Sequence, residues 1–269
     1  MTTYFCATCS TGFPTSDVAP AECPVCLDER QYLPPGGQRW ITQGELQAKH
    51  QSDIREVEPG LFGVGAVPGI GIAQRALVIA QPGGGVMWDC IPLVTGEAVD
   101  RIRELGGLRA IAISHPHFFT AMNDWSEALG GVPIVLHQEL QRHVVNEGPN
   151  VTYWSGETHD LGQGVTLVRG GGHFTGSTWL HWAGGAGGKG AIFTADTIMV
   201  VPDTRWVSFM YSYPNLIPLP THEVRRIAAT TAPFAFDRIY SGWWDRVLES
   251  DAKARLAASV ERYVQAVER

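Results

Sequence analysis

Four of the five cysteines lie in the first 26 residues as two Cys-x-x-Cys pairs, Cys6 with Cys9 and Cys23 with Cys26. A Cys-x-x-Cys turn brings two sulfurs to one metal ion, and two such turns complete the tetrahedral set that zinc prefers. Thiols stay reduced in the cytoplasm, so a metal site explains this pattern better than two disulfides. We therefore predict one four-cysteine metal site that holds zinc, with iron as the alternative.

Polar side chains also follow the ends of apolar segments further along the chain. One such segment ends in His115 and His117, a glycine-rich turn presents His173, and Asp89 and Asp196 follow two further apolar runs. Imidazoles and carboxylates are ligands of zinc and of Fe(II). The three histidines and Asp196 are thus candidate ligands, and Asp89 is a candidate to hold a ligand imidazole through its other ring nitrogen.

Short strands alternate with helices in the segments that must position these residues, which predicts a layered α/β arrangement. Thr42 and Glu45 form a capping-box signal for a short helix before His50. The other expected helices cover 95–105, 118–129, 221–231 and 251–267. The expected strands cover 53–57, 61–66, 76–81, 85–89, 108–114, 132–137, 165–170, 177–183, 190–195 and 237–242.

The cysteine-rich segment is expected to form a separate small module. Its second pair, CPVC with Pro24 inside, resembles the knuckle of a zinc ribbon or of rubredoxin. The Pro/Gly-rich stretch 33–38 marks its end, because these residues favour turns over regular structure. We predict a four-cysteine module over residues 1–36 and a main domain over residues 37–269.

Taken in chain order, Asp89 and the strings HPH, GGHFTGS and TAD resemble the metallo-β-lactamase fold family, which includes glyoxalase II, RNase Z and the persulfide dioxygenases. The resemblance implies an α/β fold, a four-layer αββα metallo-β-lactamase sandwich, for the main domain behind the small four-cysteine knuckle. It also implies that His115, His117 and His173 bind the first metal of the family and that Asp196 bridges to the second.

The sequence departs from the family at the second metal. The family motif His-x-His-x-Asp-His continues here as HPHFFT, so Phe119 and Thr120 replace its acid and its last histidine, and Trp243 stands where a final histidine is expected. Asp124, close behind the motif, is expected to be an exposed helix residue and no substitute for the missing acid. A mononuclear site with zinc or iron follows, in which Asp196 and Asp89 support catalysis.

Three functions fit this site. The leading prediction is a metal-dependent hydrolase of a small acyl substrate, such as an ester, a thioester or a lactone, because a metal-bound water attacks such carbonyls. The second is a mononuclear Fe(II) dioxygenase or redox protein, with His115, His173 and Asp196 as a 2-His-1-carboxylate set. The third is a non-catalytic binding protein that metals stabilise.

Composition limits the partners. The 269 residues carry 20 Lys and Arg against 27 Asp and Glu, a net charge of −7, and no basic stripe, which argues against nucleic acid. No apolar run reaches the roughly 20 residues that span a bilayer, and no secretion signal opens the sequence. We expect a cytoplasmic protein that acts on a small molecule without nucleic acid or membrane, and its oligomeric state is not indicated by the sequence.

Overall fold

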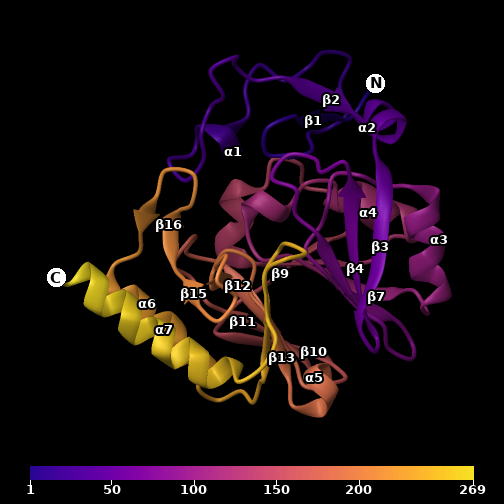
Figure 1. The fold of residues 1–269 in the computed structure, drawn as a ribbon. Coiled ribbons are helices and arrows are strands. Elements are labelled where there is room, and N and C mark those ends of the chain that lie inside the picture. The colour runs from indigo at the N-terminus through magenta and orange to yellow at the C-terminus, as the bar shows by residue number, and fades with distance from the viewer. The chain divides into compact units, whose positions relative to one another are not determined.

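The computed structural model describes all residues 1–269, which divide into two compact units (Figure 1). Unit 1 comprises Met1–Leu136 and Gln141–Tyr153. Unit 2 comprises His137–Leu140 and Trp154–Arg269. The predicted boundary at residue 36 lies inside unit 1 and stays a prediction.

Unit 1 contains a seven-stranded sheet in the order β3-β4-β5-β6-β7-β8-β9. Its strands are β3 (Gln51–Glu58), β4 (Leu61–Val67), β5 (Ala76–Ile79), β6 (Gly85–Trp88), β7 (Leu108–Ala112), β8 (Ile134–His137) and β9 (Val151–Trp154). Strands β3 to β6 pair antiparallel, whereas β7 pairs parallel with both β6 and β8. Asp89 directly follows β6 and His115 soon follows β7. Both residues therefore lie at the same edge of the sheet, where the carboxyl ends of the parallel strands meet.

The N-terminal part of unit 1 carries its own small sheet. Strand β1 (Tyr4–Cys6) pairs antiparallel with β2 (Trp40–Thr42), and helix α1 (Pro24–Leu27) lies between them in sequence. Helix α2 (Gln43–Lys49) begins with the predicted capping box, in which the Thr42 side chain accepts the Glu45 N–H and the Glu45 side chain accepts the Thr42 N–H. Helix α3 (Gly96–Glu104) begins at the predicted cap, Thr95, and turns its apolar face inward.

One helix prediction is wrong in an informative way. Where the sequence predicts a single helix over 118–129, the chain forms a 3-10 turn, η1 (Pro116–Phe118), and a separate helix, α4 (Met122–Ala128). The break falls at Thr120, whose φ of 36° is in the left-handed region and ends a right-handed helix. The Thr120 carbonyl instead accepts the N–H of Gly12, at 3.0 Å. A second 3-10 segment, η2 (Gln138–His143), follows β8.

Unit 2 contains a six-stranded sheet in the order β10-β11-β12-β13-β18-β19, in which only β13 and β18 pair parallel. Its strands are β10 (Thr158–Gly162), β11 (Val165–Arg169), β12 (Thr178–Trp182), β13 (Ala191–Phe193), β18 (Arg238–Tyr240) and β19 (Val247–Leu248). The remaining short elements are the turn α5 (Gly185–Gly188) and two ribbons, β14 (Met199–Val200) with β15 (Val207–Ser208) and β16 (Met210–Ser212) with β17 (Ile217–Pro218).

Helices α6 (Thr221–Thr231) and α7 (Ala252–Val267) run side by side in unit 2, as Figure 1 shows, and both match their predictions closely. Their apolar faces share one core with the sheet: Ile227 of α6 and Leu256 of α7 are buried together with Trp179. This core holds the sheet whose loops carry His173, after β11, and Asp196, after β13. None of the helices in the structure combines the length and the apolar character that a membrane span requires.

Candidate metal centres

The four cysteines form one compact group in unit 1. Their sulfur atoms all lie within 4.8 Å of one another. The Cys6 and Cys26 sulfurs are 3.6 Å apart, and so are those of Cys9 and Cys23. A tetrahedral ion with Zn–S bonds of about 2.3 Å places its sulfurs about 3.8 Å apart, so the cluster fits such an ion. All four side chains are buried. The predicted four-cysteine metal-binding group is confirmed.

Local backbone structure orients the cysteine sulfur atoms. Cys23 directly precedes α1, and Pro24 supplies a first helical residue with a suitable fixed φ. The N–H of Cys26 donates to the Cys23 carbonyl at 3.1 Å, which closes the turn between them. Gln38 secures that turn, because its side-chain oxygen accepts the Cys23 N–H at 2.9 Å. Hydrogen bonding from Cys23 is the main cause that lowers the pKa of Cys6, and it is also the main cause that raises the pKa of Cys9 and of Cys26. Metal binding requires thiolates, so an ion would displace the protons that Cys9 and Cys26 retain.

His115 and His117 lie together at the end of β7, in unit 1. Their rings are 5.0 Å apart between centroids, and both are buried. The backbone before them is held by Asp89, whose carboxylate accepts the N–H of Ser114 at 2.8 Å. The Ser114 hydroxyl lies 2.9 Å from Nδ1 of His115, so an Nδ1–H donating to it leaves the lone pair on Nε2 for a metal.

His173 and Asp196 lie together in unit 2. Nε2 of His173 is 3.7 Å from a carboxylate oxygen of Asp196. Two ligands at about 2.0–2.2 Å from one ion stand roughly 3.0–3.8 Å apart for angles of 90–120°, so this pair fits a shared metal. The Met210 carbonyl, 3.2 Å from Nδ1 of His173, accepts the proton of that nitrogen and leaves Nε2 as the ligand atom. The Tyr213 hydroxyl donates to the Asp196 carbonyl at 2.9 Å.

Glycine makes the His173 turn possible. Gly171 and Gly172 have φ values of 63° and 78°, in the left-handed region where a side chain is strained. A Cβ on Gly172 would also stand 2.6 Å from Ile227 of α6. The glycine-rich string in the sequence therefore serves the sharp turn that presents His173, as predicted.

Comparison with known proteins places the chain in a family. No protein-family model matches it. The uncharacterized protein YmaE of Bacillus subtilis (strain 168) is 40% identical over 266 residues, which cover 98% of this chain and 96% of that protein. The chain belongs to the YmaE family.

Solved structures show which fold this chain adopts. The metallo-β-lactamase DIM-1 matches with a TM-score of 0.61 at 16% identity over 81% of this chain and 98% of its own. MEM-A1, a subclass B3 enzyme from a soil metagenome library, matches with a TM-score of 0.53 at 19% identity over 81% of this chain and 98% of its own. A metallo-β-lactamase from Cronobacter sakazakii with a HARLDQ motif matches with a TM-score of 0.53 at 18% identity, over 83% and 96%. The metallo-β-lactamase fold predicted from the sequence is confirmed.

The predicted ligands of this YmaE-family chain thus form three groups. The structure brings the four cysteines together, His115 with His117 in unit 1, and His173 with Asp196 in unit 2. His115, His117, His173 and Asp196 each offer one ligand atom, and all are buried. That the two pairs share one ion, and that Asp89 supports catalysis, stay predictions.

Two positions of the metallo-β-lactamase motif His-x-His-x-Asp-His are occupied in this chain by side chains that are not metal ligands. Phe119 and Thr120 are both buried, at 3% and 4% exposure. The expectation for Asp124 is wrong, because it is partly buried, and burial raises the pKa of its carboxyl to about 6. Repulsion from Glu127 adds to this rise, while a hydrogen bond with Gln43 opposes it. Burial of a helix residue by a neighbouring segment leaves no signal in the local sequence.

Other histidines of this YmaE-family chain have structural surroundings. His137 is buried with Nε2 3.2 Å from the Gly156 carbonyl, and burial lowers its pKa. His181 lies against the Ala235 carbonyl in the same way, and burial lowers its pKa too. The sequence did not single out Tyr213, whose contact with Asp196 joins loops that follow different strands. Ser114, by contrast, stands next to His115, and a hydroxyl beside a candidate ligand is a usable signal.

Proposed function

We propose that this protein is a metal-dependent hydrolase that acts on a small acyl substrate through one ion held by His115, His117, His173 and Asp196. One observation carries the proposal: a metallo-β-lactamase fold presents three buried imidazoles and one buried carboxylate, with no further acid or imidazole at positions 119, 120 and 243. This donor set suits a single ion.

The neighbours of the ligands support the proposal. Ser114 and the Met210 carbonyl orient the rings of His115 and His173 with Nε2 as the ligand atom. Such partners raise the basicity of a ligand and restrict its rotation. Tyr213 holds the backbone of Asp196, so the carboxylate does not depend on a loop end that is free to move. When bound, a zinc or Fe(II) ion supplies Lewis acidity and lowers the pKa of a coordinated water.

The buried replacements Phe119 and Thr120 narrow the choice of substrate. Neither side chain can accept the proton of an attacking water or carry a second ion next to a leaving group. Substrates whose leaving group needs strong stabilisation should therefore react slowly, which disfavours β-lactams and phosphodiesters. Esters, thioesters and lactones have better leaving groups or polarisable carbonyls, and they are the substrates we propose. The net charge of −7 favours a small molecule over a nucleic acid.

We also propose zinc as the metal of the four-cysteine group, because zinc favours four thiolates in a tetrahedron. Cysteines of this set must stay reduced to bind it, so we propose a cytoplasmic location.

The test combines metal analysis with a substrate panel. Protein purified without added metals should carry two metals per chain. Wild type should hydrolyse at least one ester, thioester or lactone, and Asp196→Ala should lose this activity. Asp203→Ala is the matched control, because Asp203 sits on the surface of the same unit in an ion pair with Arg205.

Several results would contradict the proposal. Acyl hydrolysis that survives Asp196→Ala would contradict a mechanism in which Asp196 is an essential metal ligand. Efficient hydrolysis of a phosphodiester would show that a second ion or an equivalent group is present. Iron in the histidine site together with oxygen consumption on a thiol or persulfide would favour the dioxygenase, and a single metal held only by cysteines would favour a binding protein.

A further inference from the structure

The four-cysteine module touches the loop that carries His115 and His117. We call residues 115–121 the His-x-His loop. The segment after the first Cys-x-x-Cys pair returns along β1, where the N–H of Cys6 donates to the Thr11 carbonyl at 3.0 Å. On its other side, the N–H of Gly12 donates to the carbonyl of Thr120 at 3.0 Å. One short segment thus connects the cysteines with the end of the His-x-His loop.

This contact admits only glycine. A Cβ on Gly12 would stand 2.7 Å from the Thr120 carbonyl oxygen and 2.9 Å from the ring of Phe5. The first neighbour is backbone and cannot swing aside. Gly12 does not have a positive φ, so its lack of a side chain serves the close approach and not an unusual backbone conformation. The hydrogen bond is made at the residue that breaks the predicted helix, where Thr120 has a φ of 36°.

The first Cys-x-x-Cys pair also contacts the segment that leads to Gly12. The hydroxyl of Thr11 lies 3.2 Å from the sulfur of Cys9, and the N–H of Ser10 donates to the Cys6 carbonyl at 2.7 Å. Cys6 and Cys9 belong to the four-cysteine group, so an ion bound to their sulfurs would also restrain the segment that leads to Gly12. Small metal-binding modules gain most of their folding free energy from the metal.

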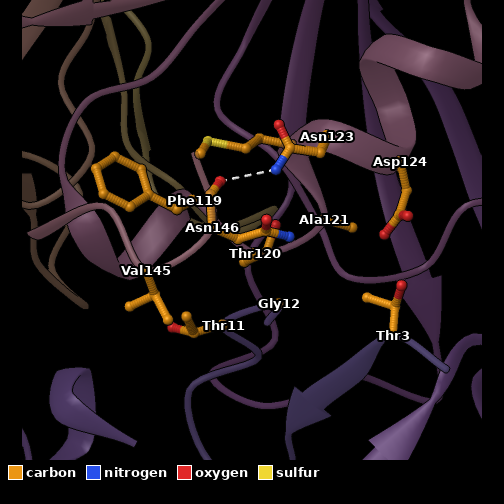
Figure 2. A pocket seen from close by; sticks show the side chains of 11 residues that line it. Thr3, Thr11, Gly12, Phe119, Thr120, Ala121, Asn123, Asp124, Val145 and Asn146 are labelled. Atoms are coloured by element: carbon orange, nitrogen blue, oxygen red, sulfur yellow. Dashed lines mark hydrogen bonds between the residues drawn. The ribbon is translucent and has the colours of Figure 1, made fainter. Parts of the chain in front are cut away.

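A second route joins the same two parts of unit 1. Val145 packs against the buried cluster around the cysteines. Its neighbour Asn146 accepts a hydrogen bond from the side chain of Asn123, in α4, at 2.8 Å. Figure 2 shows these residues, together with Thr11, Gly12 and Thr120, around a small cavity of about 10 Å³. The module is therefore tied to both the His-x-His loop and the helix that follows it.

We propose that the four-cysteine module is a positioning element for the His-x-His loop. Metal on the cysteines holds Gly12, Gly12 holds Thr120, and the loop is thereby kept in the conformation that presents His115 and His117. Gly12 is a positioning residue, since it acts through the loop. The effect on metal binding by the two histidines rests on the proposed function, whereas the effect on the loop itself does not.

The test compares Gly12→Ala with Gly36→Ala in the zinc-loaded protein. Gly36 lies in the same module, has no positive φ, and has nothing within 4 Å of an added Cβ, so its variant controls for the glycine-to-alanine change. Zinc is removed with increasing concentrations of a chelator, and the zinc left per chain is measured. Gly12→Ala should keep the cysteine-bound zinc and release the other at about 10- to 100-fold lower chelator concentration, the usual effect of losing a group that supports a metal ligand. Gly36→Ala should match wild type.

Hydrogen exchange measures the loop directly. The amides of Phe118 and Phe119 are bonded within the loop, to the carbonyls of His115 and Pro116. They should exchange about tenfold faster in Gly12→Ala than in Gly36→Ala. Unchanged exchange would overturn the proposal. If wild type binds no metal at the histidines but the loop still exchanges faster in Gly12→Ala, the proposed function fails and the positioning role stands.

A second measurement on wild type covers the case in which Gly12→Ala does not fold. A mercurial reagent ejects metal from thiolates and leaves imidazole ligands alone. As the cysteine-bound zinc leaves, exchange in residues 115–121 should accelerate, with no matching change in α6 or α7. Exchange in the His-x-His loop that stays at its original rate after the zinc has left would overturn the proposal.

Discussion

Replacing Asp124 by asparagine should stabilise the protein at neutral pH. Burial raises the pKa of this carboxyl from 3.8 to about 6, a shift of about two units. At 1.36 kcal/mol per unit, this shift corresponds to about 3 kcal/mol of destabilisation from the ionised form. The side chain keeps part of its solvent contact, so we halve this figure to about 1.5 kcal/mol.

A second effect opposes the first. Asp124 lies in the first turn of α4, where a negative charge interacts favourably with the helix N-terminus by about 0.3–1 kcal/mol. Asparagine loses this interaction but retains an amide that can bond to Gln43. The net gain for Asp124→Asn at pH 7 is therefore about 1 kcal/mol in the free energy of unfolding.

The pH dependence identifies the cause. Because the folded pKa lies above the unfolded one, the stability linked to this carboxyl is fully present below pH 3.8 and is lost as the pH rises through about 6. The advantage of Asp124→Asn should thus be largest at pH 7 and vanish near pH 3.5. Protonation of histidines affects both proteins alike and cancels in the difference.

Urea denaturation at several pH values, followed by circular dichroism, measures this difference. Asp100→Asn is the control, since Asp100 is 71% exposed in its pair with Arg103 and should change stability little at any pH. A variant that is no more stable than wild type at pH 7, or whose advantage persists at pH 3.5, would refute the reasoning.

Three further changes test separate parts of the structure. Cys23→Ser should remove one metal per chain and expose roughly the first 30 residues to proteolysis, because the metal supplies the folding free energy of such a module. Unchanged metal content would contradict the four-cysteine site. His173→Ala should remove one metal while the cysteine-bound metal stays, as metal analysis with and without a mercurial reagent will show; loss of both metals or of neither would contradict separate sites. Tyr213→Phe removes a partly buried hydrogen bond to the Asp196 carbonyl and should lower the free energy of unfolding by about 1 kcal/mol with both metals retained. A change of less than a few tenths of a kcal/mol in urea denaturation would show that this bond adds nothing.

Features that depend on neighbours in the sequence could be predicted. The capping box of Thr42 and Glu45 lies within four residues, and the turn that presents His173 is encoded by the glycines directly before it. The two Cys-x-x-Cys pairs fall in one short segment, so their union into a metal-binding group followed from cysteine chemistry alone. The fold followed from the order of motifs along the chain.

Features that depend on distant partners could not be predicted. The break between η1 and α4 is stabilised by Gly12, more than a hundred positions before Thr120, and the pattern over 118–129 is helical when considered alone. Asp124 is partly buried and forms a hydrogen bond with Gln43, which a helical pattern does not reveal. Tyr213 meets Asp196 only because two loops of unit 2 come together.

The order of the metal ligands along the chain also determines which ligand set is synthesised first. All four cysteines, and the strands β1 and β2 that pair beside them, lie within the first 42 residues, whereas the last of the proposed histidine and aspartate ligands is Asp196. Chains generally fold from the N-terminus while they are being synthesised. The sulfur ligands therefore leave the ribosome as a complete set long before the imidazoles do. A metal bound to them would hold Gly12 in place before Thr120 has been made, so the support for the later site is built first.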